Sequence, residues 1–218
     1  MSSRKITFVP GEYYHIYNRG VDKRLIFSNK KDVDRFMQCM NEFNTKEPIG
    51  SIHEGSFLKN SMDIKSKPLI SFVAYCLNPN HYHFIMSPLI NKGIESFMHR
   101  LGTGYTMYFN KKYNRSGSLF QGRFKASHID SNEYLLHVSA YVNLNNLTHQ
   151  LGGWASKLVR SSWDEYVSSP PKKGMCEKDI ILGQFKNADE YKDFALSSLQ
   201  DIIDRKKRDK NMQGVLID

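Results

Sequence analysis

The pattern of hydrophobic and polar residues in the first part of the chain predicts a strand, then a helix and then a loop. Residues 13–18 (YYHIYN) are rich in aromatic side chains and lie between two glycines, which predicts a β-strand. Residues 30–43 then place apolar side chains every three or four positions, which predicts a helix that Ser28 caps. Residues 46–67 are polar and carry Gly and Ser, so they predict a long loop of a kind that is often functional.

The centre of the chain predicts a hairpin followed by a helix. Residues 69–77 (LISFVAYCL) and 81–86 (HYHFIM) are typical of two strands, and the intervening Asn78-Pro79-Asn80 is typical of a turn. Residues 92–113 carry apolar side chains at helical spacing, which predicts the second helix.

A further strand and two helices complete the predicted elements. Residues 119–129 (LFQGRFKASHI) predict a strand after a turn. Asp130 with Glu133 is typical of a capped helix start, and that helix is predicted to run to about Asn145. Residues 188–206 predict the last helix.

The order of these elements is β-α-β-β-α-β-α, which predicts an α+β fold. We expect a ferredoxin-like or RRM-like antiparallel sheet with the helices on one face. The secondary-structure signals in the sequence weaken after two adjacent glycines at positions 152 and 153. We therefore expect a catalytic or binding domain over residues 1–150 and a C-terminal helical extension over residues 151–218.

Composition favours a polyanionic partner and argues against a membrane protein. The 218 residues carry 31 Lys and Arg against 22 Asp and Glu, a formal net charge of +9. The longest apolar stretch, residues 69–77, is shorter than the about 20 residues that a membrane-spanning helix needs. The first residues lack the apolar core of a secretory signal, so we expect a cytoplasmic, nucleoid-associated protein. Three widely spaced cysteines predict neither a disulfide framework nor a thiolate zinc site.

Two histidines form the sharpest candidate site. His81 and His83 are two positions apart on a predicted strand, so their imidazoles project from one face. Such a pair can bind one metal ion, although strand histidines that are merely hydrogen-bonded show the same pattern. Residues 64–94 contain no Asp or Glu. A further ligand must therefore come from elsewhere in the fold, from substrate phosphate or from water.

The helix after the last strand of the sheet supplies a candidate for this ligand. His137, Tyr141 and Asn145 are four residues apart, so they share a helix face beside the core stripe. Tyr141 is a candidate nucleophile and Asn145 a candidate oxygen ligand, although a packing tyrosine with a polar tip is equally compatible. Tyr134 is the first alternative nucleophile.

Basic residues concentrate between positions 91 and 130, where seven stand against two acidic residues and alternate with aromatic side chains. This mixture is typical of proteins that bind single-stranded or distorted nucleic acid, although a solvated helix face accounts for some of it. The first strand adds a glycine that permits close backbone approach, two adjacent tyrosines and an arginine, although a strand with aromatic core residues explains this segment at least as well. The predicted DNA-contacting residues are Gly11, Tyr13, Tyr14, Arg19, Arg100, Lys111, Lys112, Arg115, Arg123 and Lys125.

Taken together, these motifs resemble the single-tyrosine HUH transposases of the IS200-like superfamily, and most of all the REP-associated tyrosine transposases. The resemblance rests on GEYYHIYNRG, LNPNHYHFIM, LFQGRFKASHI and AYVNLNN, with further likeness in LVRSSWDEY and ILGQF…EYKDF. It implies a ferredoxin-like catalytic fold and metal-dependent cleavage and rejoining of single-stranded DNA, with hairpin-containing repeat DNA as the expected partner.

By position, the resemblance implies that His81, His83 and Asn145 bind the metal ion and that Tyr141 is the nucleophile, with a 5′-phosphotyrosine intermediate. Two imidazoles with oxygen ligands suit Mg²⁺ or Mn²⁺ as the cofactor. A homodimer is possible in this family, so Tyr141 could act in cis or in trans. Two other classes stay open: a non-catalytic nucleic-acid-binding protein on the same fold, and a small-molecule metallohydrolase, which the missing carboxylate base disfavours.

Overall fold

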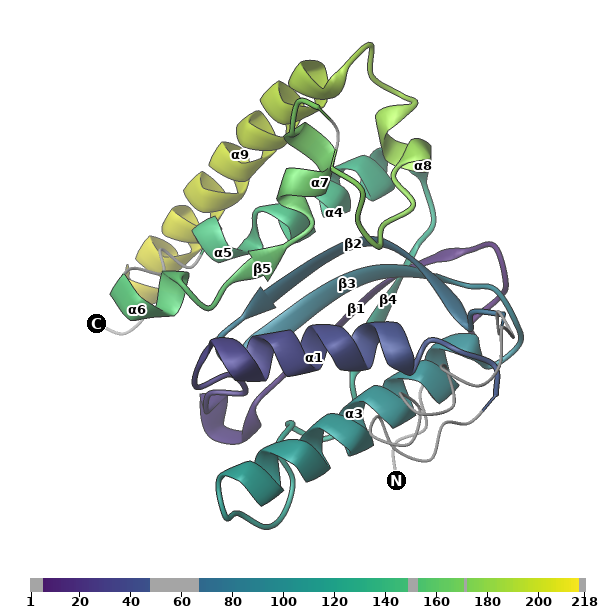
Figure 1. Ribbon diagram of the computed structural model, residues 1–218. Helices are drawn as coiled ribbons and strands as arrows, with labels where there is room; N and C mark the ends of the chain where they lie inside the picture. The colour runs from purple at the N-terminus through teal and green to yellow at the C-terminus, as the bar shows by residue number, and fades with distance from the viewer. Residues whose placement is uncertain (1–5, 48–66, 149–152, 171, 216–218) are drawn as a thin grey trace.

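A five-stranded antiparallel sheet forms the centre of the molecule (Figure 1). The computed structural model describes residues 6–47, 67–148, 153–170 and 172–215. The strands lie in the order β4-β1-β3-β2-β5. They are β1 (Tyr13–Arg19), β2 (Ile70–Asn78), β3 (His81–Pro88), β4 (Lys125–Ile129) and β5 (Arg160–Ser161).

Helices cover both faces of this sheet (Figure 1). On one face lie α1 (Lys30–Glu42) and α3 (Gly93–Lys112), and on the other lie α4 (Asn132–Asn143) and α9 (Ala188–Val215). None of the helices in the described part of the chain is both long enough and apolar enough to cross a membrane. The short helices are η1 (Val21–Lys23), α5 (Asn145–Thr148), α6 (Gly153–Ser156), α7 (Trp163–Val167) and α8 (Asp179–Leu182).

Strand alternation divides the side chains between two apolar cores. Ile16 of β1 and Phe84 of β3 pack with α1 and α3, whereas Ile85 of β3 packs with α4 and the C-terminal segment. The antiparallel register places Ile16 opposite Phe84 and therefore Tyr17 opposite His83. The odd-numbered side chains of β1 and β3 around Tyr17 and His83 therefore face α4.

The predicted fold class is confirmed: the chain forms an α+β antiparallel sheet with the elements in the predicted order. One detail is wrong, because the helices do not all lie on one face: α1 and α3 cover one face of the sheet and α4 covers the other. The apolar run of β2 buries Phe72 on the α1 and α3 side and Val73 and Cys76 on the other side. A strand that is apolar on both faces needs cover on both, and α4 with the C-terminal segment provides the second cover.

The predicted capping residues are displaced by one position, although α1 begins at Lys30 as expected. Asn29, not Ser28, caps α1, and its side chain and that of Asp32 form a reciprocal capping box. Ser131, not Asp130, caps α4 through a hydrogen bond from the Tyr134 backbone. In both cases the cap is the polar residue that has extended backbone geometry directly before the helix.

The strand prediction over residues 119–129 is too long. β4 begins at Lys125, and Gly122 has a φ of +65°, which interrupts an extended conformation. β5 was not predicted, because a strand of two residues leaves no recognisable sequence pattern. It pairs with β2 at Cys76 and Leu77. Most of the predicted 46–67 loop and the predicted domain boundary at 150 lie outside the described residues.

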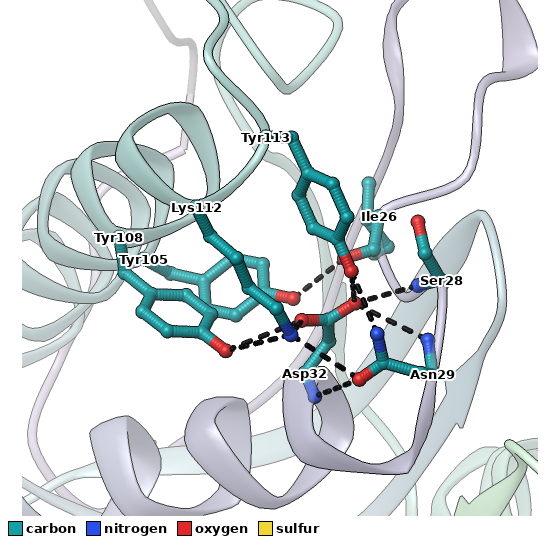
Figure 2. A network of polar contacts seen from close by, with 8 residues as sticks. All are labelled: Ile26, Ser28, Asn29, Asp32, Tyr105, Tyr108, Lys112 and Tyr113. Atoms are coloured by element: carbon teal, nitrogen blue, oxygen red, sulfur yellow. Dashed lines mark hydrogen bonds and ion pairs between the residues drawn. The ribbon is translucent and has the colours of Figure 1, made fainter.

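A buried carboxylate joins the N-terminus of α1 to the C-terminus of α3, as Figure 2 shows. Asp32 is fully buried and accepts hydrogen bonds from Ser28 N (2.8 Å), Tyr113 Oη (2.7 Å) and Tyr108 Oη (3.2 Å). Lys112 Nζ forms an ion pair with the same carboxylate. Burial alone would raise the pKa of Asp32, but the hydrogen bonds from Lys112, Tyr113 and Ser28 hold it below its usual value. The carboxylate is therefore charged and fully paired.

Candidate active site

His81 and His83 lie at the start of β3 on the sheet face that α4 covers. Their ring centroids are 5.3 Å apart and the ring planes are nearly perpendicular, at 89°. At this separation both rings can reach one ion at the usual metal–nitrogen distance of about 2.1 Å. The strand thus brings the two imidazoles together, as the spacing predicted.

The end of α4 and the start of α5 bring two more groups to these histidines. Tyr141 of α4 is half-buried, and its ring lies edge-on to His83 with centroids 5.5 Å apart. Asn145 is fully buried, and its Oδ1 lies 3.1 Å from His81 Nε2. Although α4 ends at Asn143, Asn145 begins the next helical turn, so both side chains still reach the site.

His137, the third residue predicted on that helix face, is not part of the site. Its side chain is exposed and its Nδ1 lies 3.3 Å from Ser198 Oγ of α9. The ring also contacts Phe194, with centroids 5.2 Å apart. His137 therefore belongs to the packing of α9 on α4.

Two asparagines hold His81 in place. Asn80 Oδ1 lies 2.6 Å from His81 Nδ1, which assigns the ring proton to Nδ1 and leaves Nε2 with its lone pair. The buried Asn78 amide nitrogen lies 3.0 Å from His81 Nε2 and 2.8 Å from Asn145 Oδ1. Asn78 thereby links the two groups that the sequence predicted as metal ligands.

A third histidine, His15, contacts His83 from the neighbouring strand β1. His15 Nε2 on β1 is 2.8 Å from His83 Nδ1, and the ring of Tyr17 stacks on His15 with centroids 5.0 Å apart. Burial lowers the pKa of His15 to about 4, so this imidazole is neutral near pH 7.

The donor set fits a divalent cation. It offers two imidazole nitrogens and the amide oxygen of Asn145, which suit Mg²⁺ or Mn²⁺ when phosphate or water completes the coordination. Asn78 Oδ1 and Asn145 Nδ2 are buried without a hydrogen-bond partner among the described residues. No cluster of three His, Cys, Asp or Glu in that part of the chain could hold a metal ion. A metal site here therefore depends on the Asn145 amide and on ligands from outside the protein.

His81, His83 and Tyr141 line a pocket of about 580 Å³. Its wall contains three basic side chains and, among the described residues, no carboxylate, so it attracts phosphate. Burial raises the pKa of the Tyr141 phenol, an effect that the nearby Asn145 amide partly opposes. The phenol is therefore neutral before substrate binds. The lining residues are Tyr17, Asn18, Arg19, Lys23, Asn80, His81, His83, Gln121, Lys125 and Tyr141.

The predicted DNA-contacting residues divide into an accessible and an internal group. Arg19 and Lys125 line the candidate pocket, and Arg123 lines a second pocket of about 730 Å³ beside α3. Lys111 is exposed on α3. Gly11 has a φ of +87° in the turn before β1, so the backbone conformation of the turn accounts for a glycine at this position.

Four further predicted contacts have partners inside the protein, and so does Arg19, which donates to Gln121 Oε1. Tyr14 is 1% exposed and its hydroxyl bonds to the backbone of Thr7 and Val9, so it is a core residue. Its neighbour Tyr13 is half-buried and packs against the second core. Lys112 is bound to Asp32. The other two are arginines: Arg100 donates to the Thr45 and Lys46 carbonyls, and Arg115 donates to Asn110 Oδ1.

Seven residues of the site were not among the predicted site residues: His15, Tyr17, Asn18, Lys23, Asn78, Asn80 and Gln121. The alternation of β1 already placed His15 and Tyr17 on one face. It could not show that this face meets His83, because the register between β1 and β3 joins residues far apart in the chain.

Comparison with known proteins places this arrangement in context. The family described as "Transposase IS200 like" matches residues 9–145. The chain is also similar to the structure of a REP-associated tyrosine transposase bound to a REP hairpin, with a TM-score of 0.51 and 13% identity over 83% of this chain and 93% of that one. At this identity the likeness shows a common fold.

A bacterial tRNA(His) guanylyltransferase-like protein in complex with ATP gives a TM-score of 0.33 and 6% identity, over 78% of this chain and 72% of that one. That similarity is too low to support an argument about the fold or the site. No curated protein matches the chain.

Proposed function

This chain belongs to the IS200-like transposase family, and from that premise we propose that it cleaves and rejoins single-stranded DNA through a covalent bond to Tyr141. One observation carries the proposal. Tyr141 lies beside His83 in a basic pocket that His81 also lines, and the buried Asn145 lies beside His81. A nucleophile, candidate metal ligands and phosphate-binding cations thus meet at one place.

The reaction is a transesterification. Tyr141 Oη attacks the scissile phosphorus in line with the P–O3′ bond, and the phenol loses its proton as the new P–O bond forms. The 3′ oxygen leaves and takes up a proton, so the products are a 5′-phosphotyrosine and a free 3′-hydroxyl. Rejoining is the reverse attack by a 3′-hydroxyl. No nucleotide cofactor is needed, because the phosphotyrosine bond preserves the energy of the broken bond.

His81, His83 and Asn145 would hold Mg²⁺ or Mn²⁺, which when bound polarises the scissile phosphate. The basic side chains of Arg19, Lys23 and Lys125 bind the phosphates on either side. The Asn145 amide partly opposes the rise that burial causes in the pKa of the Tyr141 phenol.

Within one chain, Tyr141 already lies beside His83, with ring centroids 5.5 Å apart. This proximity supports cleavage in cis, without a tyrosine from a second copy. The similar transposase structure contains a REP hairpin, and we extend that substrate class to this chain: single-stranded DNA next to a hairpin.

A labelled hairpin oligonucleotide tests the proposal. With Mn²⁺, the wild-type chain is expected to form a protein adduct that survives denaturing electrophoresis and carries a 3′-end label, because the nucleophile keeps the downstream strand. Chelator should abolish the adduct. Tyr141→Phe should abolish it while DNA binding persists. Tyr134→Phe is the matched control, since Tyr134 lies on the same helix but outside the pocket.

Two results would contradict the proposal in different ways. An adduct that survives Tyr141→Phe would assign the nucleophile to Tyr17, a second phenol that lines the pocket, because Tyr134, the alternative expected from the sequence, is not among the lining residues. The second result is that the wild type binds the oligonucleotide in a salt-sensitive way, does not depend on divalent metal and forms no adduct. The chain would then be a non-catalytic DNA-binding protein.

A further inference from the structure

His83 has a partner that the reaction chemistry does not itself require. We propose that His15 is a positioning residue that orients His83 for metal binding, an inference that rests on the proposed function. His15 would act by accepting the Nδ1–H of His83, which leaves His83 Nε2 with the lone pair directed at the ion.

The contact between the two rings has the geometry of a strong hydrogen bond. His15 Nε2 and His83 Nδ1 are 2.8 Å apart, and the ring planes differ by 17° with centroids 5.1 Å apart. An N–H bond lies in the plane of its imidazole, and so does the lone pair of the accepting nitrogen. Two nearly coplanar rings that meet at these nitrogens therefore align donor and acceptor.

The surroundings hold His15 in this orientation. The ring of Tyr17 stacks on it at an interplanar angle of 27°, and the ring of Tyr141 lies edge-on at 85° with centroids 6.0 Å apart. Backbone pairing sets the position as well, because Tyr17 is directly opposite His83 and His15 is the diagonal neighbour. Diagonal neighbours on one sheet face are within reach of long side chains.

The same pattern occurs at the other imidazole. His81 Nδ1 lies 2.6 Å from the Asn80 amide oxygen, which leaves its Nε2 facing Asn145 Oδ1. Histidines that bind metal usually donate their second N–H to a neighbouring acceptor, and this bond fixes the tautomer and the ring plane. In this chain an amide oxygen serves one ligand and an imidazole nitrogen serves the other.

Manganese binding by the full chain, without DNA, tests the inference. Free Mn²⁺ is measured by electron paramagnetic resonance during a titration. His15→Leu removes the acceptor and should weaken Mn²⁺ binding roughly 10–100-fold, the usual cost of losing such a partner. His15→Gln keeps an acceptor oxygen and should recover part of the affinity. His128→Leu is the control, since His128 is an exposed histidine on β4 with its own partner, Glu12.

Nitrogen chemical shifts of His83 in the metal-free protein give a second readout that a merely structural role would not move. The wild type should show the Nδ1–H form, and His15→Leu should shift the ring toward a mixture of tautomers. Wild-type Mn²⁺ affinity in a folded His15→Leu protein would overturn the inference. So would a His15→Gln protein whose affinity and His83 shifts are as altered as those of His15→Leu.

His83→Gln separates this inference from the proposed function. If His83→Gln loses Mn²⁺ binding and His15→Leu does not, the metal site stands and only the role of His15 is wrong. If His83→Gln binds Mn²⁺ as tightly as the wild type, or if the wild type binds none, the metal site of the proposed function fails and the inference fails with it.

Discussion

Two buried polar clusters lie on opposite faces of the sheet, and they differ in how their hydrogen bonds are satisfied. On the α1 and α3 face, Asp32 accepts bonds from two backbone N–H groups, two phenols and the Lys112 ammonium. On the α4 face, the site contains histidines and amides with no carboxylate among its described lining residues. There Asn78 Oδ1 and Asn145 Nδ2 have no partner within the described part of the chain.

The difference separates a stabilising cluster from the cluster that we propose is reactive. A buried polar group costs free energy unless it is hydrogen-bonded, so a complete network such as that of Asp32 contributes to stability. An incomplete network lowers stability, and a fold retains it where a ligand completes the bonds. Changes in the Asp32 cluster should therefore affect unfolding, and changes in the histidine cluster should affect DNA and metal chemistry.

The largest expected effect is on activity. Tyr141→Phe should lower the rate of adduct formation by roughly 10⁴-fold or more, as removal of an enzyme nucleophile usually does. Since the change only removes a hydroxyl at the pocket wall, the urea midpoint of unfolding should stay near that of the wild type. A large loss of stability in this variant would erase the distinction between the two clusters.

The next effect is on stability alone. Asp32→Ala removes the partner of Lys112 and one half of the α1 capping box, and it should lower the free energy of unfolding by about 3 kcal/mol, as measured in urea. Adduct formation by the folded fraction should persist. Asp34→Ala is the matched control, because Asp34 is exposed on the same helix. Equal destabilisation by the two variants would contradict this assignment.

Acid should act through the same carboxylate. The pKa of Asp32 is lowered in the folded protein, so its contribution is present above the unfolded-state pKa of about 3.9 and is lost as the pH falls through the folded value. Urea unfolding at pH 5 and pH 3 should show a larger loss for the wild type than for Asp32→Asn. Identical losses would mean that other carboxylates dominate acid unfolding.

The smallest expected effect distinguishes two lysines. Lys125→Gln removes a cation from the pocket and should reduce by about 1 the slope of log binding constant against log salt concentration for single-stranded DNA. Lys112→Gln should leave this slope unchanged and lower the urea midpoint, since its ammonium pairs with Asp32. Fluorescence anisotropy over a salt series measures the slope, and the reverse outcome would exchange the roles of the two lysines.

Local rules were enough for several parts of the site. Strand alternation placed His81 and His83 on one face, and the helical period brought Tyr141 and Asn145 to a common side. Both rules depend only on backbone geometry within a few residues, which the side-chain pattern reveals. The hairpin of β2 and β3 was equally accessible, because a turn signal joins two adjacent apolar segments.

Other features were decided by contacts between distant parts of the chain. Lys112 and Lys125 look alike in the sequence, but Asp32, 80 residues away, binds the first, whereas the second lines the pocket. His15 became the partner of His83 through strand pairing across 68 positions. Sequence period alone determined which side chains share a face, whereas only the packed sheet decided which faces meet, because strand register and helix docking depend on the shapes of both partners at once.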